Sequence, residues 1–149
     1  MSILLCSIAL SSCNPMGYPT VRFLVPNGFS GPFIIVEDPL GEPIEAKHGI
    51  TTFSIPASGV LKVKSAAVLQ GTMTIEARRV NGEQIPLDHE ASPTQIALRG
   101  GGKMKASDSE PFFGFFIGTE SAQIAVDFAT IRPISGRDVP NAPGASPAP

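Results

Sequence analysis

The chain is poor in the residues that carry most enzyme and metal chemistry. Its 149 residues include two cysteines, two histidines, one tyrosine and no tryptophan. The lack of tryptophan, with a single tyrosine, argues against a carbohydrate-binding platform, which generally buries sugar C–H groups on such flat rings. Lysine and arginine number 11 against 13 acidic residues, and the net charge of −2 leaves no basic patch for nucleic acid.

Glycine and proline are abundant, at 15 residues each. This composition is typical of short segments joined by many turns, as in all-β proteins. A convincing helical period is missing beyond the first dozen residues, and the length suits one domain with a real core. We therefore predict one all-β domain, either an antiparallel β-sandwich or a partly closed barrel.

The one long apolar run, Ile3 to Leu10, is too short to cross a bilayer, which takes about 20 residues. It has the length of a signal-peptide core. The sequence LSSC, Leu10 to Cys13, begins at the last residue of this run and resembles the lipobox of bacterial lipoproteins. The resemblance implies a signal peptide over residues 1–12, and a lipid anchor on Cys13, which becomes the new N-terminus. The protein would then be exported, membrane-anchored and face the periplasm or exterior.

Two alternatives to the lipobox stay open, an ordinary secretory signal and an apolar N-terminal strand. The positively charged n-region is missing because only Met1 and Ser2 precede the run, so the true start lies upstream or export is inefficient. Cys6 lies inside the apolar run. Cleavage before Cys13 would leave one alkylated cysteine, and hence no disulfide, thiolate nucleophile or cysteine metal site.

The remaining chain divides by composition into three parts. Residues 13–19 form a short membrane tether, whose six residues after the cysteine, NPMGYP, reach roughly 20 Å when extended. Residues 20–131 form the predicted sandwich domain. Residues 132–149 hold five prolines and almost nothing to bury, which predicts a disordered tail, or alternatively a Pro-rich ligand for a partner.

Several segments show the patterns of strands. Residues 21–26 and 60–65 alternate apolar and polar, and 32–38 is continuously apolar at its start, as in a strand covered on both sides. Residues 72–87 predict a hairpin with a type I′ turn at Asn81-Gly82. Residues 121–130 alternate again and predict a further strand.

Five motifs occur in an order that resembles a family of bacterial proteins, often lipoproteins, known only as a domain of unknown function. The resemblance covers about residues 21–121 and implies no activity and no assigned site. The chain departs from the family pattern at Pro32-Phe33, where the family tends to carry tryptophan. The motifs are VPNGFSGPFIIV (25–36), GEPI (41–44), FSIPASGVLKVKS (53–65), RGGGK (99–103) and FFIGTE (115–120).

The glycine run between Arg99 and Lys103 invites comparison with a phosphate-binding loop. That motif is excluded because Ala97 and Met104 stand where it needs glycine and serine or threonine. We predict a mobile hairpin loop here, with an anion held between Arg99 and Lys103 if the loop binds anything.

Phenylalanines cluster at residues 112–118, FFGFFIG, and occupy both faces of a strand. Such a strand must be covered on both sides or expose a sticky patch. Two hypotheses follow, a covered central strand, or a partner surface lined by Phe112 and Phe116.

Enzyme signatures are weak. The chain has no Gly-x-Ser-x-Gly elbow, and HEASP begins like a zinc motif but has Pro93 where histidine is needed. We expect no cofactor and no metal. The predicted function is a non-enzymatic binding or structural module of the bacterial envelope, with an envelope protein or the cell wall as partner. The alternative is a metal or serine hydrolase that depends on His48 or His89.

Overall fold

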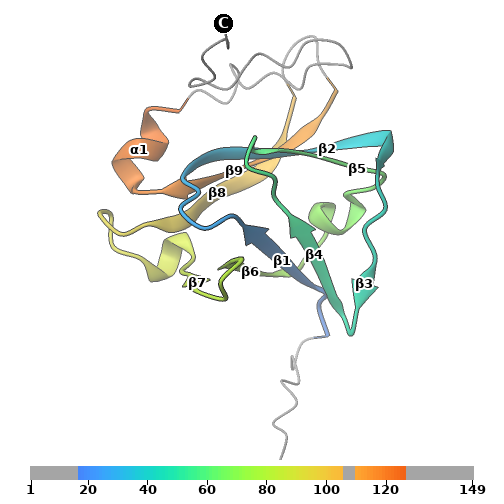
Figure 1. The fold of residues 1–149 in the computed structure, drawn as a ribbon, viewed down its shortest axis with the longest axis horizontal. Helices are drawn as coiled ribbons and strands as arrows, with labels where there is room; N and C mark the ends of the chain where they lie inside the picture. The colour runs from blue at the N-terminus through green and yellow to red at the C-terminus, as the bar shows by residue number, and fades with distance from the viewer. Residues whose placement is uncertain (1–16, 106–109, 127–149) are drawn as a thin grey trace, which may run out of the picture.

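The computed structural model describes residues 17–105 and 110–126. These residues form a five-stranded and a four-stranded β-sheet that pack face to face (Figure 1). The sheets stay separate and do not close into a barrel. The predicted all-β, one-domain sandwich is therefore confirmed, and the barrel alternative is not.

The five-stranded sheet has the order β3-β4-β1-β6-β7. Its central strand β1 pairs in parallel with both neighbours, whereas the short outer strands pair antiparallel with β4 and β6. The strand bounds are β3 (Ala46–Lys47), β4 (Ile50–Ser54), β1 (Thr20–Val25), β6 (Thr74–Arg79) and β7 (Gln84–Ile85).

The four-stranded sheet has the order β5-β2-β9-β8. Here β2 pairs in parallel with β5, and the pairs β2–β9 and β9–β8 are antiparallel. The bounds are β5 (Val60–Val63), β2 (Gly31–Glu42), β9 (Phe112–Gly118) and β8 (Ala97–Met104).

Both sheets are thus mixed, whereas we predicted antiparallel pairing. The reason is the path of the chain, which crosses repeatedly between the sheets from β1 to β6, with only β3 and β4 following each other in the same sheet. A connection that crosses to the other sheet and returns can bring the next strand back in the same direction. The alternation of apolar residues records only which face is buried, so it carries no information on strand direction.

The core lies between the two sheets. Val21, Phe23 and Val25 of β1 point inward and are fully buried, as the alternation predicts. The ring of Phe23 lies 5.4 Å from that of Phe33 on β2 and 4.6 Å from that of Phe115 on β9, measured between centroids. Aromatic contacts across the sandwich therefore join the two sheets.

A second apolar cluster lies on the outer side of the four-stranded sheet. It contains Ile34, Val36 and Phe112, with Val60 and Met104 packed against them. Strand β2 is consequently buried on both faces from Phe33 to Val36, as its continuous apolar run predicts.

The hairpin over residues 72–87 is confirmed, but its turn differs from the prediction. The N–H of Gly82 donates to the Arg79 carbonyl, and the N–H of Arg79 donates to the Glu83 carbonyl. The loop is therefore three residues long, and only its last residue, Gly82, has a positive φ, of 92°. This is a type I turn followed by a glycine bulge.

The turn between β3 and β4 is the one with two residues at positive φ. His48 and Gly49 have φ of 51° and 77°, and they join the paired residues Lys47 and Ile50. Type I′ turns require positive φ at both positions. The exposed imidazole of His48 thus belongs to a tight hairpin turn.

The predicted strand over residues 121–130 is wrong where the structure describes it. Glu120–Ile124 form the short helix α1, which Thr119 caps by accepting a hydrogen bond from the N–H of Ala122. The Thr119 side chain thus satisfies a backbone N–H at the start of the helix. The alternation of apolar and polar residues, on which the strand prediction rested, does not reveal such a capping contact. Two 3-10 turns complete the elements, η1 (Ala67–Gln70) and η2 (Asp88–Glu90).

None of the helices within residues 17–105 and 110–126 has the length and apolar character needed to cross a bilayer.

Candidate functional site

The glycine run lies within strand β8, so the predicted mobile hairpin loop is wrong. Arg99 pairs with Phe116 on β9, and the next pair joins Gly102 to Gly114, which leaves one extra residue on β8. Such a bulge needs unusual backbone angles, and Gly101 supplies a φ of 141°. A side chain on Gly101 would also meet the Phe115 ring at 2.6 Å.

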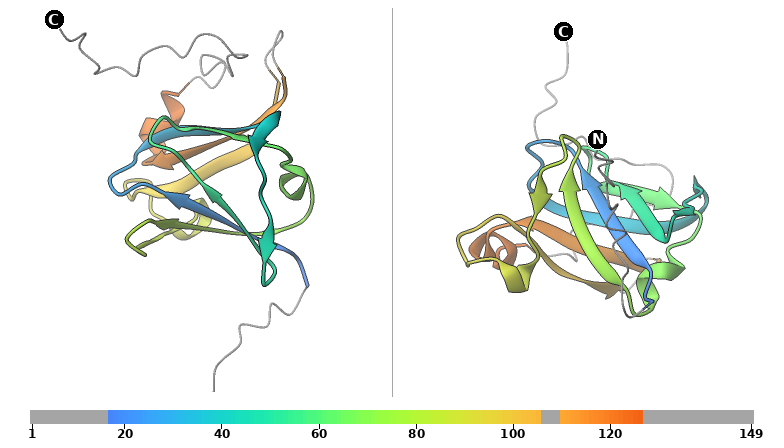
Figure 2. Two further views of the ribbon diagram at one scale, coloured as in Figure 1. Left: turned by 45° about the vertical axis from the view of Figure 1, so that its right-hand side comes forward. Right: turned by 90° about the horizontal axis from the view of Figure 1, so that it is seen from below.

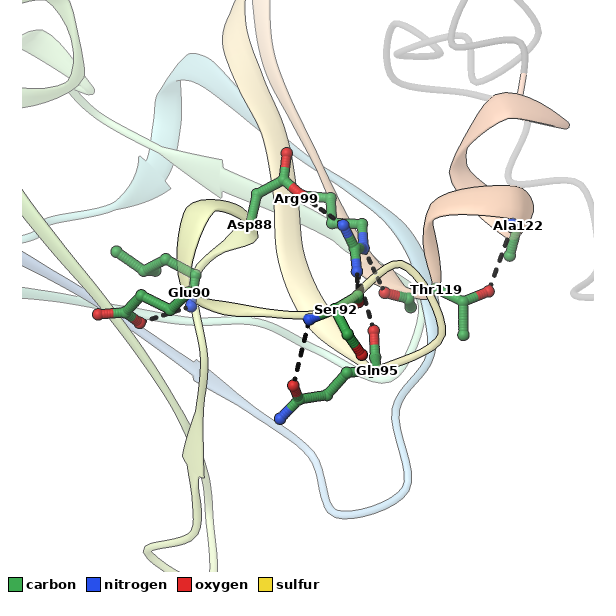
Figure 3. Close-up of polar contacts among 9 residues, drawn as sticks. Asp88, Glu90, Ser92, Gln95, Arg99, Thr119 and Ala122 are labelled. Carbon is green, nitrogen blue, oxygen red and sulfur yellow. Dashed lines mark hydrogen bonds and ion pairs between the residues drawn. The ribbon is translucent and has the colours of Figure 1, made fainter.

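Arg99 is the most connected polar residue of this region and is only 2% exposed. Its guanidinium donates to the carboxylate of Asp88 and, at 2.8 and 3.0 Å, to the carbonyls of Ser92 and Gln95. Its Nε donates to the Gly118 carbonyl at 3.0 Å. Figure 3 shows these acceptors arranged around one guanidinium. Arg99 therefore clamps the 88–95 segment to the end of β9.

The clamped segment is also held by its own side chains. The Glu90 carboxylate accepts a hydrogen bond from the N–H of Leu87 at 3.0 Å. The N–H of Ser92 donates to the Gln95 side chain at 3.4 Å (Figure 3). These local hydrogen bonds hold η2 and the following turn in a defined conformation. The Arg99 guanidinium binds to the segment in that conformation.

The predicted anion contact between Arg99 and Lys103 is contradicted by this geometry. In a regular strand two residues four positions apart would share a face. The extra residue of the bulge reverses the alternation, so Arg99 lies opposite Phe116 on the outer face and Lys103 lies opposite Phe113 on the other. Arg99 already serves four protein acceptors, whereas Lys103 is exposed.

A pocket of about 560 Å³ opens beside the clamp, between η2 and α1. The residues described around it carry two carboxylates, from Asp88 and Glu120, and an amide from Gln123. The described lining residues include no serine, threonine, cysteine, lysine or histidine, so they supply no nucleophile of the serine-hydrolase kind. The lining is Asp88, Ala91, Arg99, Glu120, Gln123, Ile124 and Val126.

The hypothesis of a partner surface at Phe112 and Phe116 is also contradicted. Both side chains lie on the outer face of β9, as their spacing predicts, but they are only 2% and 3% exposed. All seven residues of the strand are buried. The alternative hypothesis, a central strand covered on both faces, describes the structure.

The two histidines are not brought together. His48 lies in the β3–β4 turn and His89 in η2, which stand on opposite sides of the molecule in different orientations (Figures 1 and 2). Within the described ranges, no group of three histidine, cysteine, aspartate or glutamate residues could hold a metal ion.

Sequence reasoning missed the acceptors of the Arg99 clamp. Three of the four are backbone carbonyls, which every residue carries, so no residue type reveals them. The only usable signal was the charge of Asp88, eleven positions before Arg99. Cys13 and residues 132–149 lie outside the described residues.

The fold and this site define a small all-β sandwich with a structural arginine clamp. No family model and no curated protein matches the chain, so the resemblance to the family of unknown function stays a prediction. One solved structure is similar, "Putative Lipoprotein from Bacillus anthracis", with 18% identity and a TM-score of 0.46. The match covers 81% of this chain and 82% of that one. Similarity at this level assigns no function.

Proposed function

We propose that this chain is an exported lipoprotein, anchored through Cys13, whose sandwich serves as a non-enzymatic binding or structural module at the bacterial envelope. The observation that carries the proposal is the LSSC sequence at the end of a short apolar run, followed closely by a folded domain. The first strand begins at Thr20, seven residues after Cys13. This is the arrangement expected of a domain tethered near a membrane.

The start of the domain supports anchoring through a short connector. The carbonyl of Pro19 accepts a hydrogen bond from Thr74, and the N–H of Thr20 donates to Gly49. The chain is thus pinned at Pro19. Only five residues separate Cys13 from this point, a reach of roughly 20 Å.

The arrangement of polar groups supports a non-enzymatic role. Arg99, the one buried charged residue described, is used to hold the fold. The hydrolase alternative needs a histidine placed beside a nucleophile or a metal. Its two candidates, His48 and His89, stand apart, and no observation favours it. The partner in this proposal is an envelope protein or the wall itself.

Lipidation is tested by the mass of the mature protein. We expect a chain that begins at Cys13 and carries acyl groups, and that partitions into detergent. Cys13→Ala should abolish the acyl mass and leave an unprocessed or soluble protein. Cys6→Ala is the matched control, because this residue lies in the segment removed, and it should change nothing. An intact Met1, or cleavage elsewhere without acylation, would refute the proposal.

A further inference from the structure

The outer face of the five-stranded sheet has an unusual composition for a protein of net negative charge. Along each strand the side chains point alternately inward and outward, and residues that pair across neighbouring strands point to the same side. The inward set contributes to the core. The outward set is uncovered by any other described strand or helix (Figure 2). It comprises Thr20, Arg22, Leu24, Lys47, Ile50, Thr52, Ser54, Thr74, Glu76, Arg78 and Gln84.

This face is cationic. It carries Arg22, Lys47 and Arg78 against the single carboxylate of Glu76, a net charge of +2. The strands of the four-stranded sheet carry equal numbers of both signs, and the whole chain has −2. Two further carboxylates, Glu45 and Glu83, stand at the margins of the face, and Glu83 is paired with Arg79 at 3.8 Å.

The two arginines of this face are held in position and remain partly exposed. Glu76 pairs with Arg22 and, at 3.6 Å, with Arg78, so one carboxylate serves two guanidinium groups. The Nε of Arg78 is buried and has no hydrogen-bond partner among the described residues, so it is not one of the donors that a headgroup can reach. Side chains of Arg22 and Arg78 are 31% and 39% exposed, so their outer donors can reach phosphate groups.

The chain enters the domain from the same side. Gly17–Pro19 leave β1 on the outer side of the five-stranded sheet, away from the four-stranded sheet (Figures 1 and 2). Tyr18 is 40% exposed at this exit. Tyrosine is enriched at membrane interfaces, where an apolar ring and a polar tip are both accommodated.

We propose that the outer face of the five-stranded sheet rests on the bilayer that holds the anchor, with its cations on anionic phospholipid headgroups. This inference rests on the proposed lipidation of Cys13. A connector of roughly 20 Å keeps the face on its exit side within contact of the surface. Each arginine or lysine near an anionic surface adds to the attraction, and salt screens it within a Debye length of about 10 Å at 0.1 M.

The test uses the mature lipidated protein in vesicles of phosphatidylcholine, with or without phosphatidylglycerol. Cys13 is alkylated in that protein, so one introduced cysteine can carry an environment-sensitive dye. Thr52→Cys places the dye at the centre of the face, and Lys103→Cys places it on the four-stranded sheet. We expect the dye at position 52, and not at 103, to shift to the blue and lose accessibility to aqueous quencher on anionic vesicles.

Charge variants separate a specific face from general attraction. Lys47→Gln with Arg78→Gln should abolish the shift at position 52, as should 1 M salt. Lys62→Gln with Lys103→Gln removes the same charge from the other sheet and should leave the shift intact. If the protein is acylated but the dye at position 52 stays exposed to water, or responds equally to the two double substitutions, the proposed membrane contact of this face is refuted and the proposed lipidation is not. A protein without an acyl mass on Cys13 overturns the proposed function and this inference with it.

Discussion

At the scale of single residues, Arg99 shows how a charged side chain can be buried in a small sandwich. Its guanidinium is planar and presents donors in several directions, which suits it to several acceptors at once. Three backbone carbonyls and the Asp88 carboxylate surround it. Hydrogen bonds to charged groups are stronger than neutral ones, so this residue stabilises a segment that is otherwise mainly loop.

We predict that Arg99→Gln lowers the free energy of unfolding by about 3 kcal/mol, because three carbonyls lose a charged donor. Asp88 contributes less, since its side chain is 56% exposed and can return to water. Lys103→Gln on the same strand is the control and should change stability by less than about 0.5 kcal/mol. Urea denaturation followed by circular dichroism measures both. Equal losses of unfolding free energy for Arg99→Gln and Lys103→Gln would show that the Arg99 clamp does not stabilise the fold.

A second prediction at this scale concerns Gly82 in the β6–β7 turn. An added Cβ would meet nothing within 4 Å, so only its φ of 92° opposes a side chain. Gly82→Ala should cost about 1 kcal/mol. Gly71 also has open space but a φ of −106°, so Gly71→Ala should be neutral or slightly stabilising. The difference in melting temperature isolates backbone strain, and its absence would contradict the turn geometry.

At the scale of elements, β9 connects most of the molecule. It lies between β2 and β8, and its two faces serve different clusters. Phe113 and Phe115 enter the core between the sheets, whereas Phe112 joins the cluster on the outer side. A strand buried on both faces has little freedom to slip, because any shift of register would expose apolar side chains.

We predict that Phe116→Ala in β9 costs about 3–5 kcal/mol of stability, as for other buried phenylalanines. Ile124→Ala on α1 is the control, because that side chain is 79% exposed and should matter by less than about 0.5 kcal/mol. The measurement is the midpoint and slope of urea denaturation. If Phe116→Ala were as stable as the control and only changed self-association, the partner-surface hypothesis would return.

At the scale of the whole molecule, the sandwich separates two kinds of surface. The four-stranded sheet carries balanced charge and an apolar outer cluster that is buried. The five-stranded sheet presents an open, cationic face on the side where the chain enters. A lipid anchor on a short connector would turn this asymmetry into an orientation. The five-stranded sheet would face the membrane, and the four-stranded sheet would face away from it.

Much of the fold could be predicted from local patterns. The alternation in β1 and β5 correctly identifies the buried residues, and the continuous apolar run of β2 correctly predicts burial on both faces. The candidate site could not be predicted in the same way. One extra residue in β8 places Arg99 and Lys103 on opposite faces, and nothing in RGGGK shows which glycine makes the bulge.

The sequence by itself determined the all-β class, the inward residues of most strands and the hairpin at Asn81-Gly82, because these follow from periodicity and glycine over a few residues. It also carries the prediction of a lipid anchor at Cys13. Only the tertiary structure decided the parallel pairing of β1, the helix at Glu120–Ile124, and the burial of Phe112, Phe116 and Arg99. Those features depend on segments far apart in the chain, whose contacts exist only once the two sheets have packed.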